Sequence, residues 1–293
     1  MGFLMAHHGV AVEVLLDTGT LIKHVKVKRR SGHVVGDKVS VNGEILTRHE
    51  RRSELVRRDP GGGAHVLAAN LDVVFVVCSH YPELKPGLVD RAIVAARAGG
   101  IEPIVVVNKS DLQGTEEFLV KMKEAYGEDL RVLHLSAKTE DGALDLQKAL
   151  REGEKAALVG PSGVGKSSLL NALLPKAQLL EGVVSEATGK GRHTTVVATL
   201  HLLEGGGGLV DTPGIRDFGL VHVEPQELAQ HFPGVADLVE EGCKFRNCLH
   251  HGEPGCAVTR AYDDGKLSWE RLKTYRALLK DLLEAEEEAR RHR

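Results

Sequence analysis

The sequence has few aromatic residues, few cysteines, no long apolar run and little net charge. No apolar stretch reaches the roughly 18 residues that a membrane-spanning helix needs. The first fourteen residues also lack a charged start followed by an apolar block and a cleavage site. We therefore expect a cytoplasmic protein with no membrane partner. Because the net charge is only −3, any binding of nucleic acid must come from a local patch.

The four cysteines have a spacing that argues against disulfides. Cys78 ends an apolar run and is expected in the core. Cys243, Cys248 and Cys256 lie within fourteen residues, beside two consecutive histidines, His250 and His251. Three thiolates and one imidazole make a closed, structural type of tetrahedral zinc site, with no position left for a reactive water. Spacing alone does not choose between the two histidines.

Residues 1–65 contain short β-type runs separated by turn signals, which is typical of a small barrel. The expected strands cover residues 10–16, 20–27 and 33–41. The segment carries 11 Lys+Arg against 7 Asp+Glu, a local charge of +4 that can hold phosphates. Phe3 is its only aromatic residue, so we expect RNA to be contacted through backbone and shape rather than by stacking. The alternative is that these cations only solvate the barrel surface.

Beyond a glycine stretch at residues 61–63, interpreted as a linker, apolar strands alternate with helices. Nearly continuous Val/Ile runs indicate a parallel sheet covered on both faces. Strands are expected at residues 73–77, 103–107, 130–135 and 155–159, and helices at 88–98, 116–126 and 143–150.

The last of these strands enters a segment that matches the phosphate-binding loop G-x-x-x-x-G-K-[ST] and then opens a helix. Its glycines let backbone N–H groups converge on a phosphate, Lys166 places an ammonium near the outer phosphates, and the Ser167 hydroxyl can ligate Mg²⁺. The predicted nucleotide-binding residues here are Gly160, Pro161, Ser162, Gly163, Val164, Gly165, Lys166, Ser167 and Ser168.

Two shorter motifs follow buried strands, at the strand ends where ligands bind in open α/β sheets. In the first, Asn108-Lys109-Ser110-Asp111, the Asp111 carboxylate can accept two hydrogen bonds from guanine, whereas adenine offers no matching pair of donors. Taken alone, this motif also fits an ordinary strand-to-helix turn. The second, Ser136-Ala137-Lys138, is expected to close over the base. The predicted base-reading residues are Asn108, Lys109, Asp111, Ser136, Ala137 and Lys138.

Past the phosphate loop, a glycine-containing stretch ends in Thr194-Thr195, which is typical of a mobile loop that delivers a threonine hydroxyl to Mg²⁺. We assign that role to Thr195 or its neighbour Thr194. Further on, Asp211-Thr212-Pro213-Gly214 places Asp211 in the Mg²⁺ shell and the Gly214 N–H near the terminal phosphate. By itself this tetrapeptide also fits a common turn.

These motifs resemble those of the translation-factor class of GTPases, but the base-reading motifs precede the phosphate loop and the switch motifs follow it. This is the order of a circularly permuted GTPase. With a barrel in front and a Cys/His cluster behind, the chain resembles the ribosome small subunit-dependent GTPase A family (RsgA/YjeQ) over essentially its whole length. The resemblance implies a multidomain fold with an N-terminal OB-like, RNA-binding β-barrel (residues 1–63), a central α/β P-loop GTPase domain (64–221) and a C-terminal zinc-binding helical domain (222–293).

The resemblance also assigns particular residues. The family's C-x4-C-x-H-x5-C pattern falls on Cys243, Cys248, His250 and Cys256, which selects His250 as the zinc ligand. Ile215 follows Gly214 where other GTPases have a water-positioning glutamine, so hydrolysis by the free protein should be slow. His193 is the family's candidate for that role, and a solvent-facing loop histidine is the alternative. The predicted catalytic residues are Lys166, Thr195 and His193, and the predicted magnesium ligands are Ser167, Thr195 and Asp211.

The partners implied by the resemblance are GTP and GDP, the small ribosomal subunit and its rRNA. The subunit is expected to stimulate hydrolysis, and hydrolysis is expected to time the release of a monomeric protein from a nearly mature particle. Two alternatives remain open: a zinc-dependent rRNA-binding scaffold with a vestigial nucleotide site, and a permuted GTPase that acts on the large subunit. An ATP-dependent kinase is disfavoured because Asp111 reads guanine. Gly163 stands where some potassium-using GTPases carry asparagine, which leaves dependence on potassium undecided.

The permutation has a mechanical consequence, because the segment after Asp211-Thr212-Pro213-Gly214 runs directly into the C-terminal region. Movement of that switch is therefore covalently coupled to the C-terminal region. The chain ends in an amphipathic helix whose apolar face is expected to pack on the zinc region. The residues of that face are Trp269, Leu272, Tyr275, Leu279, Leu282 and Leu283.

Overall fold

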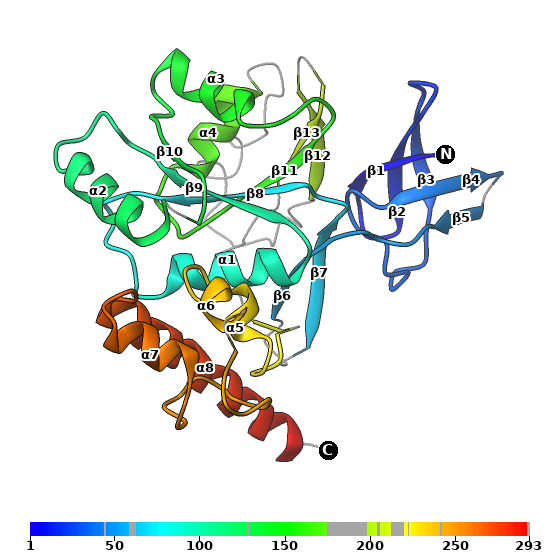
Figure 1. Ribbon diagram of the computed structural model, residues 1–293. Coiled ribbons are helices and arrows are strands. Elements are labelled where there is room, and N and C mark those ends of the chain that lie inside the picture. Colours follow the sequence, from blue (N-terminus) through cyan, green and yellow to red (C-terminus); the bar gives the residue numbers. More distant parts are fainter. Residues whose placement is uncertain are drawn as a thin grey trace, which may run out of the picture.

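The computed structural model describes residues 1–43, 45–58, 63–127, 129–174, 198–203, 206–211, 220–221, 223–240 and 242–291 (Figure 1). Its largest sheet has the strand order β10-β9-β8-β11-β13-β12-β1-β2-β3 and so runs from the centre of the molecule into the N-terminal region. Figure 1 places the N-terminal strands (residues 2–48) to the right of the central strands of this sheet and the C-terminal helices below α1 (Leu88–Ala98). Within the described ranges, every helix is too short or too polar to span a lipid bilayer.

The N-terminal region is an antiparallel β structure in which β1 pairs with both β2 and β4. Alternation buries Val12 and Val14 on β2, which is the period of two that a half-buried strand requires, whereas Leu4, Met5 and Ala6 are buried in succession on β1. The sequence prediction missed β1, whose nearly continuous apolar residues show no such alternation. The strands are β1 (Gly2–His7), β2 (Ala11–Leu16), β3 (Leu21–Lys26), β4 (Lys38–Asn42) and β5 (Ile45–Arg48).

A two-stranded hairpin follows, formed by β6 (Glu54–Arg58) and β7 (Ala64–Ala69). The two strands pair from Glu54 with Ala69 to Arg58 with Ala64, with a shift of register between Leu55 and Val56. The glycine stretch at residues 61–63, interpreted as a linker, lies in the sequence between these two paired strands. The domain limits expected at residues 63 and 221 stay a prediction.

The central sheet is parallel, as predicted, except for one antiparallel strand, β12. Successive residues of β8 face opposite sides: Val74, Val76 and Cys78 pack with α1 and α2, whereas Val73, Phe75 and Val77 pack with α3 and α4. Cys78 is fully buried, as expected. The strands are β8 (Val73–Cys78), β9 (Glu102–Val107), β10 (Val132–His134), β11 (Lys155–Val159), β12 (Thr199–Leu202) and β13 (Gly208–Asp211); the helices are α1 (Leu88–Ala98), α2 (Thr115–Tyr126), α3 (Glu140–Lys148) and α4 (Lys166–Leu173).

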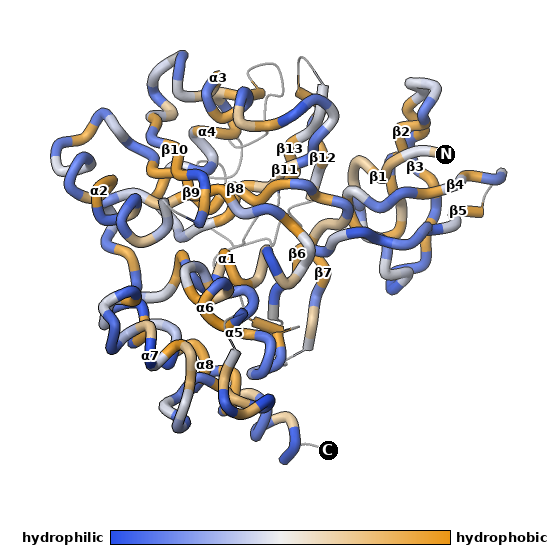
Figure 2. Tube along the Cα trace, viewed as in Figure 1, coloured by the Kyte–Doolittle hydropathy of each residue, from blue (hydrophilic) through white to orange (hydrophobic). Residues whose placement is uncertain are grey.

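In the C-terminal region, the described helices α5 to α8 and one side of α1 pack around a second core that includes Cys248 and Cys256. Leu272, Tyr275 and Leu279 of the last helix are buried in this core, which confirms the predicted amphipathic helix. Trp269 differs from the prediction and is half exposed, because it is the first residue of α8 and extends toward Tyr262 rather than the core. Figure 2 shows the most hydrophobic stretches on β8, β9 and β11 and a polar end to α8. The helices are α5 (Leu228–His231), α6 (Ala236–Glu240), α7 (Ala257–Asp263) and α8 (Trp269–Arg291).

Candidate nucleotide site and metal centre

Asn108 joins the three predicted nucleotide motifs at the carboxyl edge of the central sheet. It directly follows β9 and its side chain is buried. The Asn108 Nδ2 donates a hydrogen bond to the carbonyl of Val164 in the phosphate loop at 2.8 Å. The Asn108 Oδ1 accepts one from the backbone N–H of Ala137 at 3.1 Å. The two base-reading segments and the phosphate loop are therefore held in one fixed arrangement.

Asp111 carries a charged carboxylate beside the second base-reading segment. Lys138 Nζ donates to one carboxylate oxygen at 2.8 Å, and Ser136 Oγ donates to the other at 2.7 Å. These two hydrogen bonds, first that from Lys138 and then that from Ser136, hold the pKa of Asp111 below its ordinary value. An ionised carboxylate is the form that accepts hydrogen bonds from the two N–H groups of guanine.

Lys109 is a second bridge between motifs. Its backbone is in the left-handed region, with φ of 67°, and its Nζ donates to the carbonyls of Gly163 at 2.6 Å and Tyr81 at 2.8 Å. Sequence reasoning missed Tyr81 and its neighbour Pro82, which lies against Gly163. Their signal was their position: they follow the buried strand β8, at the edge where ligands bind in such sheets.

The phosphate loop has the tight turn that its glycines predict. Gly160 has φ of 142°, and a Cβ there would lie 2.1 Å from the carbonyl oxygen of Val77, so only glycine fits. Gly165 begins α4 without a side-chain cap, and the first turn of that helix has no acidic residue. Backbone N–H groups at such a helix start favour an anion. Lys166 Nζ folds back to donate to the carbonyls of Gly160 and Pro161 at 2.8 and 2.7 Å.

Of the remaining predicted site residues, some lie in the part of the chain that the structure describes and others do not. Ser162, Ser167 and Ser168 are exposed on the phosphate loop and the start of α4. Asp211 ends β13, the strand paired in parallel with β11, so it lies at the same edge of the sheet. His193, Thr194, Thr195 and Gly214 lie outside the described residues.

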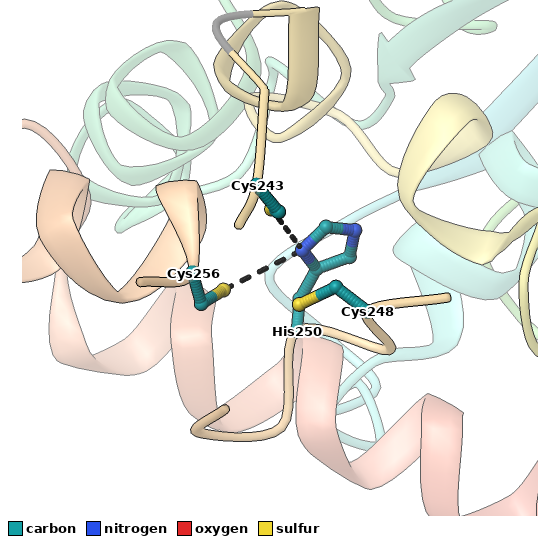
Figure 3. Close-up of side chains that lie close together, drawn as sticks. All are labelled: Cys243, Cys248, His250 and Cys256. Carbon is teal, nitrogen blue, oxygen red and sulfur yellow. Dashed lines mark hydrogen bonds between the residues drawn. The ribbon is translucent and has the colours of Figure 1, made fainter. Parts of the chain in front are cut away.

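Cys243, Cys248, His250 and Cys256 converge in the C-terminal region (Figure 3). Their ligand atoms all lie within 4.8 Å of one another, and His250 Nδ1 is 3.4 Å from Cys243 Sγ and 3.5 Å from Cys256 Sγ. Four such ligands around one tetrahedral zinc ion would be spaced about 3.8 Å apart. His250 is buried, whereas the alternative His251 is exposed. Three sulfurs and one imidazole at this spacing fit zinc.

Glu253, which sequence reasoning did not single out, and Tyr275, which it placed only on the apolar face of the last helix, support this cluster. The Glu253 carboxylate accepts hydrogen bonds from the backbone N–H groups of Leu249 and His251, both at 2.7 Å. Burial acts to raise the pKa of Glu253, but these backbone bonds outweigh it and lower that pKa to about 2. Tyr275 of α8 donates from its hydroxyl to the Leu249 carbonyl at 3.0 Å. The loop that carries His250 is thereby fixed to the last helix.

Known proteins are similar to this chain over nearly its whole length. Residues 48–221 match the RsgA GTPase family. The chain belongs to the RsgA GTPase family. The small ribosomal subunit biogenesis GTPase RsgA of Azotobacter vinelandii is 40% identical over 97% of this chain and 86% of that protein, and its namesake in Ectopseudomonas mendocina is 41% identical with the same coverage.

Two solved structures extend the similarity to the fold. The crystal structure of YjeQ from Thermotoga maritima is 29% identical, with a TM-score of 0.76 over 96% of this chain and 98% of that one. YloQ, described as a circularly permuted GTPase, is 28% identical, with a TM-score of 0.72 over 97% and 94% of the two chains. The predicted family, three-part fold and permuted motif order are confirmed. As an RsgA GTPase, the protein hydrolyses GTP.

Proposed function

We propose that this RsgA GTPase binds the small ribosomal subunit, acts in its late maturation, and leaves it when GTP is hydrolysed. The observation that carries the proposal is identity of about 40% to small-subunit biogenesis GTPases over 97% of the chain, which spans the N-terminal β region and the zinc-ligand cluster as well as the GTPase motifs. The protein acts as a monomer in the cytoplasm, where its partner is assembled.

GTP binds along the carboxyl edge of the sheet, with guanine at Asp111 and the phosphates at the start of α4. Lys166 stabilises negative charge that develops on the outer phosphate oxygens. Water attacks the γ-phosphorus in line, the bond to the bridging oxygen breaks, and GDP and phosphate leave. Mg²⁺, when bound, neutralises charge on the β- and γ-phosphates, and the exposed Ser167 hydroxyl and the Asp211 carboxylate fit it as ligands together with Thr195.

We assign the positioning of the attacking water to His193, since Ile215 can neither orient water nor accept a proton from it. The intrinsic rate is therefore low, and the ribosomal subunit accelerates it. Replacing His193 by alanine should keep GTP affinity and remove most hydrolysis. Unchanged single-turnover rates would remove His193 from the mechanism.

Coupling to release is supported by the burial of the segment that follows the Asp211 motif. Leu220 and Val223 are buried in the C-terminal core, where they pack with Val94 of α1. A change at the terminal phosphate is transmitted along a few residues of chain into the region that carries the zinc ligands. In the N-terminal region, the exposed side chains of Lys23, Lys26 and Lys28 supply cations for rRNA phosphates.

The test measures GTP hydrolysis alone, with purified small subunits and with purified large subunits. Stimulation by the small subunit only is expected. Equal turnover in all three conditions would refute the ribosomal role, and stimulation by the large subunit would favour the alternative partner.

An Asp111→Asn variant tested on GTP and XTP checks the guanine site in the same assay. Its preference should move to XTP, because the amide presents a donor to the altered base edge. Asp145→Asn, which changes an exposed carboxylate on α3, is the matched control and should keep the preference for GTP. Weak binding of every nucleotide by the unaltered protein would support the zinc-dependent scaffold instead.

A further inference from the structure

The zinc-ligand loop presents an aromatic side chain to solvent. Between Cys243 and Cys248, the side chains of Lys244, Phe245, Arg246 and Asn247 are all exposed, and Phe245 retains 44% of its accessible surface. None of these four residues is needed to complete the Cys3His cluster. The Phe245 ring is therefore a large, exposed apolar group between Lys244 and Arg246, and a partner can bind to its exposed surface.

The backbone of this loop is fixed before any partner arrives. The Lys244 N–H donates to the Gly255 carbonyl at 3.1 Å, and the Cys248 N–H donates to the Phe245 carbonyl at 3.3 Å. Lys244 also packs against Gly255, where an added Cβ would lie 2.8 Å from the Lys244 Cβ. A ring on a pre-organised loop loses little conformational entropy when it binds.

The surroundings of the ring are cationic. Lys244 Nζ lies 5.4 Å from the centroid of the Phe245 ring, and Arg246 is the next residue. Arg260 of α7 reaches the base of the loop and donates to the Gly242 carbonyl at 3.4 Å. Between residues 242 and 255 the sequence has one carboxylate, Glu253, and it is occupied by backbone N–H groups. The exposed charge is therefore suited to a polyanion.

The N-terminal β region lacks such a ring. Its one aromatic residue, Phe3, has the ammonium of Lys155 over its face, 4.0 Å from the ring centroid. That region can hold phosphates, and its one Phe, Tyr or Trp ring is less exposed than that of Phe245. The two ends of the molecule thus differ in the nucleic-acid chemistry they can recognise.

We propose that the zinc-ligand loop binds unpaired RNA, with Phe245 stacked on one base and Lys244 and Arg246 in contact with the phosphates on either side. Stacking on aromatic side chains is how proteins hold splayed-out bases, and it tolerates any sequence because every base has a π-face. The inference rests on the proposed function in that the natural RNA is rRNA of the small subunit.

The experiment uses the full-length, zinc-loaded protein without ribosomes and measures fluorescence anisotropy of a labelled oligouridine and of an RNA duplex of the same length. Phe245→Leu keeps an apolar side chain but removes the π-face, and it should weaken oligouridine binding about 5- to 100-fold. Phe245→Trp should restore binding. Tyr262→Leu, which alters another exposed aromatic residue on α7, is the matched control and should leave binding unchanged.

Lys244→Gln and Arg246→Gln should each weaken binding at low salt and lower the slope of log K against log salt by about 0.7, the value for one phosphate contact on a single strand. Equal zinc content in all variants checks that the loop is intact. Photocrosslinking of a 4-thiouridine oligonucleotide to the unaltered protein gives a second measurement, with the crosslink expected on the peptide that contains Phe245.

Equal oligouridine affinity in the unaltered protein and Phe245→Leu, or a crosslink elsewhere, would overturn the proposal. So would equal binding of single strand and duplex. The assay contains neither GTP nor ribosomes, so its failure leaves subunit-stimulated hydrolysis standing. Conversely, absence of stimulation by the subunit would not alter the oligouridine result.

Discussion

Arg271 of α8 joins the C-terminal helices to the GTPase domain through a buried ion pair. Its guanidinium pairs with Asp90 of α1, donates to the Pro233 carbonyl at 2.6 Å, and lies 5.1 and 4.6 Å from the ring centroids of Tyr126 and Phe232. The Asp90 side chain is only 5% exposed, and its other oxygen accepts a hydrogen bond from the Tyr126 hydroxyl at 3.0 Å. The buried carboxylate therefore depends on these two donors.

Replacing Arg271 by methionine keeps apolar bulk between the rings but leaves Asp90 buried without its cation. Breaking a buried pair in this way costs about 3–5 kcal/mol. The matched control is Arg91→Met, which breaks a second ion pair between the same two helices. Arg91 and its partner Asp281 are 30% and 51% exposed, and a pair of that kind contributes about 0–1 kcal/mol.

The assay is urea unfolding of the zinc-loaded protein followed by the fluorescence of its single tryptophan, Trp269, which begins α8. Arg271→Met should lose several times as much unfolding free energy as Arg91→Met. The double variant Asp90→Asn/Arg271→Met should recover part of the loss, because no charge is then buried. Equal losses for the two arginine variants would refute the argument that burial makes the Asp90 pair costly to break.

Three further results are expected. Gly160→Ala should abolish GTP binding measured by calorimetry, because the added Cβ would lie 2.1 Å from the Val77 carbonyl oxygen. The control Gly153→Ala, also at positive φ but with no atom within 4 Å of the added Cβ, should bind GTP normally. Equal GTP affinities of the two variants would contradict this steric argument. The hydrogen bond from Lys138 is the chief reason that the pKa of Asp111 lies below its ordinary value. The carboxylate therefore stays charged, and its contribution to GTP affinity should hold from about pH 8 to about pH 5 and fade only as pH falls further; loss of that contribution within this range would contradict the lowered pKa. Cys256→Ser should release bound zinc and lower the urea midpoint of the tryptophan signal, and an unchanged metal content by mass spectrometry would exclude Cys256 as a ligand.

The elements that could be predicted from the sequence are those whose pattern is decided locally. The strand β8 is an unbroken apolar run and α1 has a clear helical period, and both lie where they were expected. The strand β1 and the β6–β7 hairpin were not predicted, because β1 lacks the polar–apolar alternation of a half-buried strand and the glycine stretch between β6 and β7 was interpreted as a linker rather than a hairpin connection. The pairing of β1 with β12 joins residues nearly two hundred positions apart, which no local pattern encodes.

The residues of the candidate site fall into the same two groups, those that a local motif identifies and those that only tertiary packing identifies. Motif spacing located Asp111, the phosphate loop and the three cysteines, because each requires a fixed local sequence. The roles of Tyr81 and Glu253 depend on which backbone groups tertiary packing brings near them, and their residue types carry no signal. The link between Asp90 and Arg271 is of this second kind.

The pairing of β1 with β12 also covers one edge of β12. On one side β12 pairs with β13, and on the other it pairs with β1 through Ala6 and Thr199. Without the N-terminal region, that second side would be an open sheet edge, a row of unpaired N–H and C=O groups that can template pairing with another chain. The N-terminal β region thus extends the central sheet and also covers the edge of β12. A truncated chain that begins after β5 is expected to aggregate through that edge.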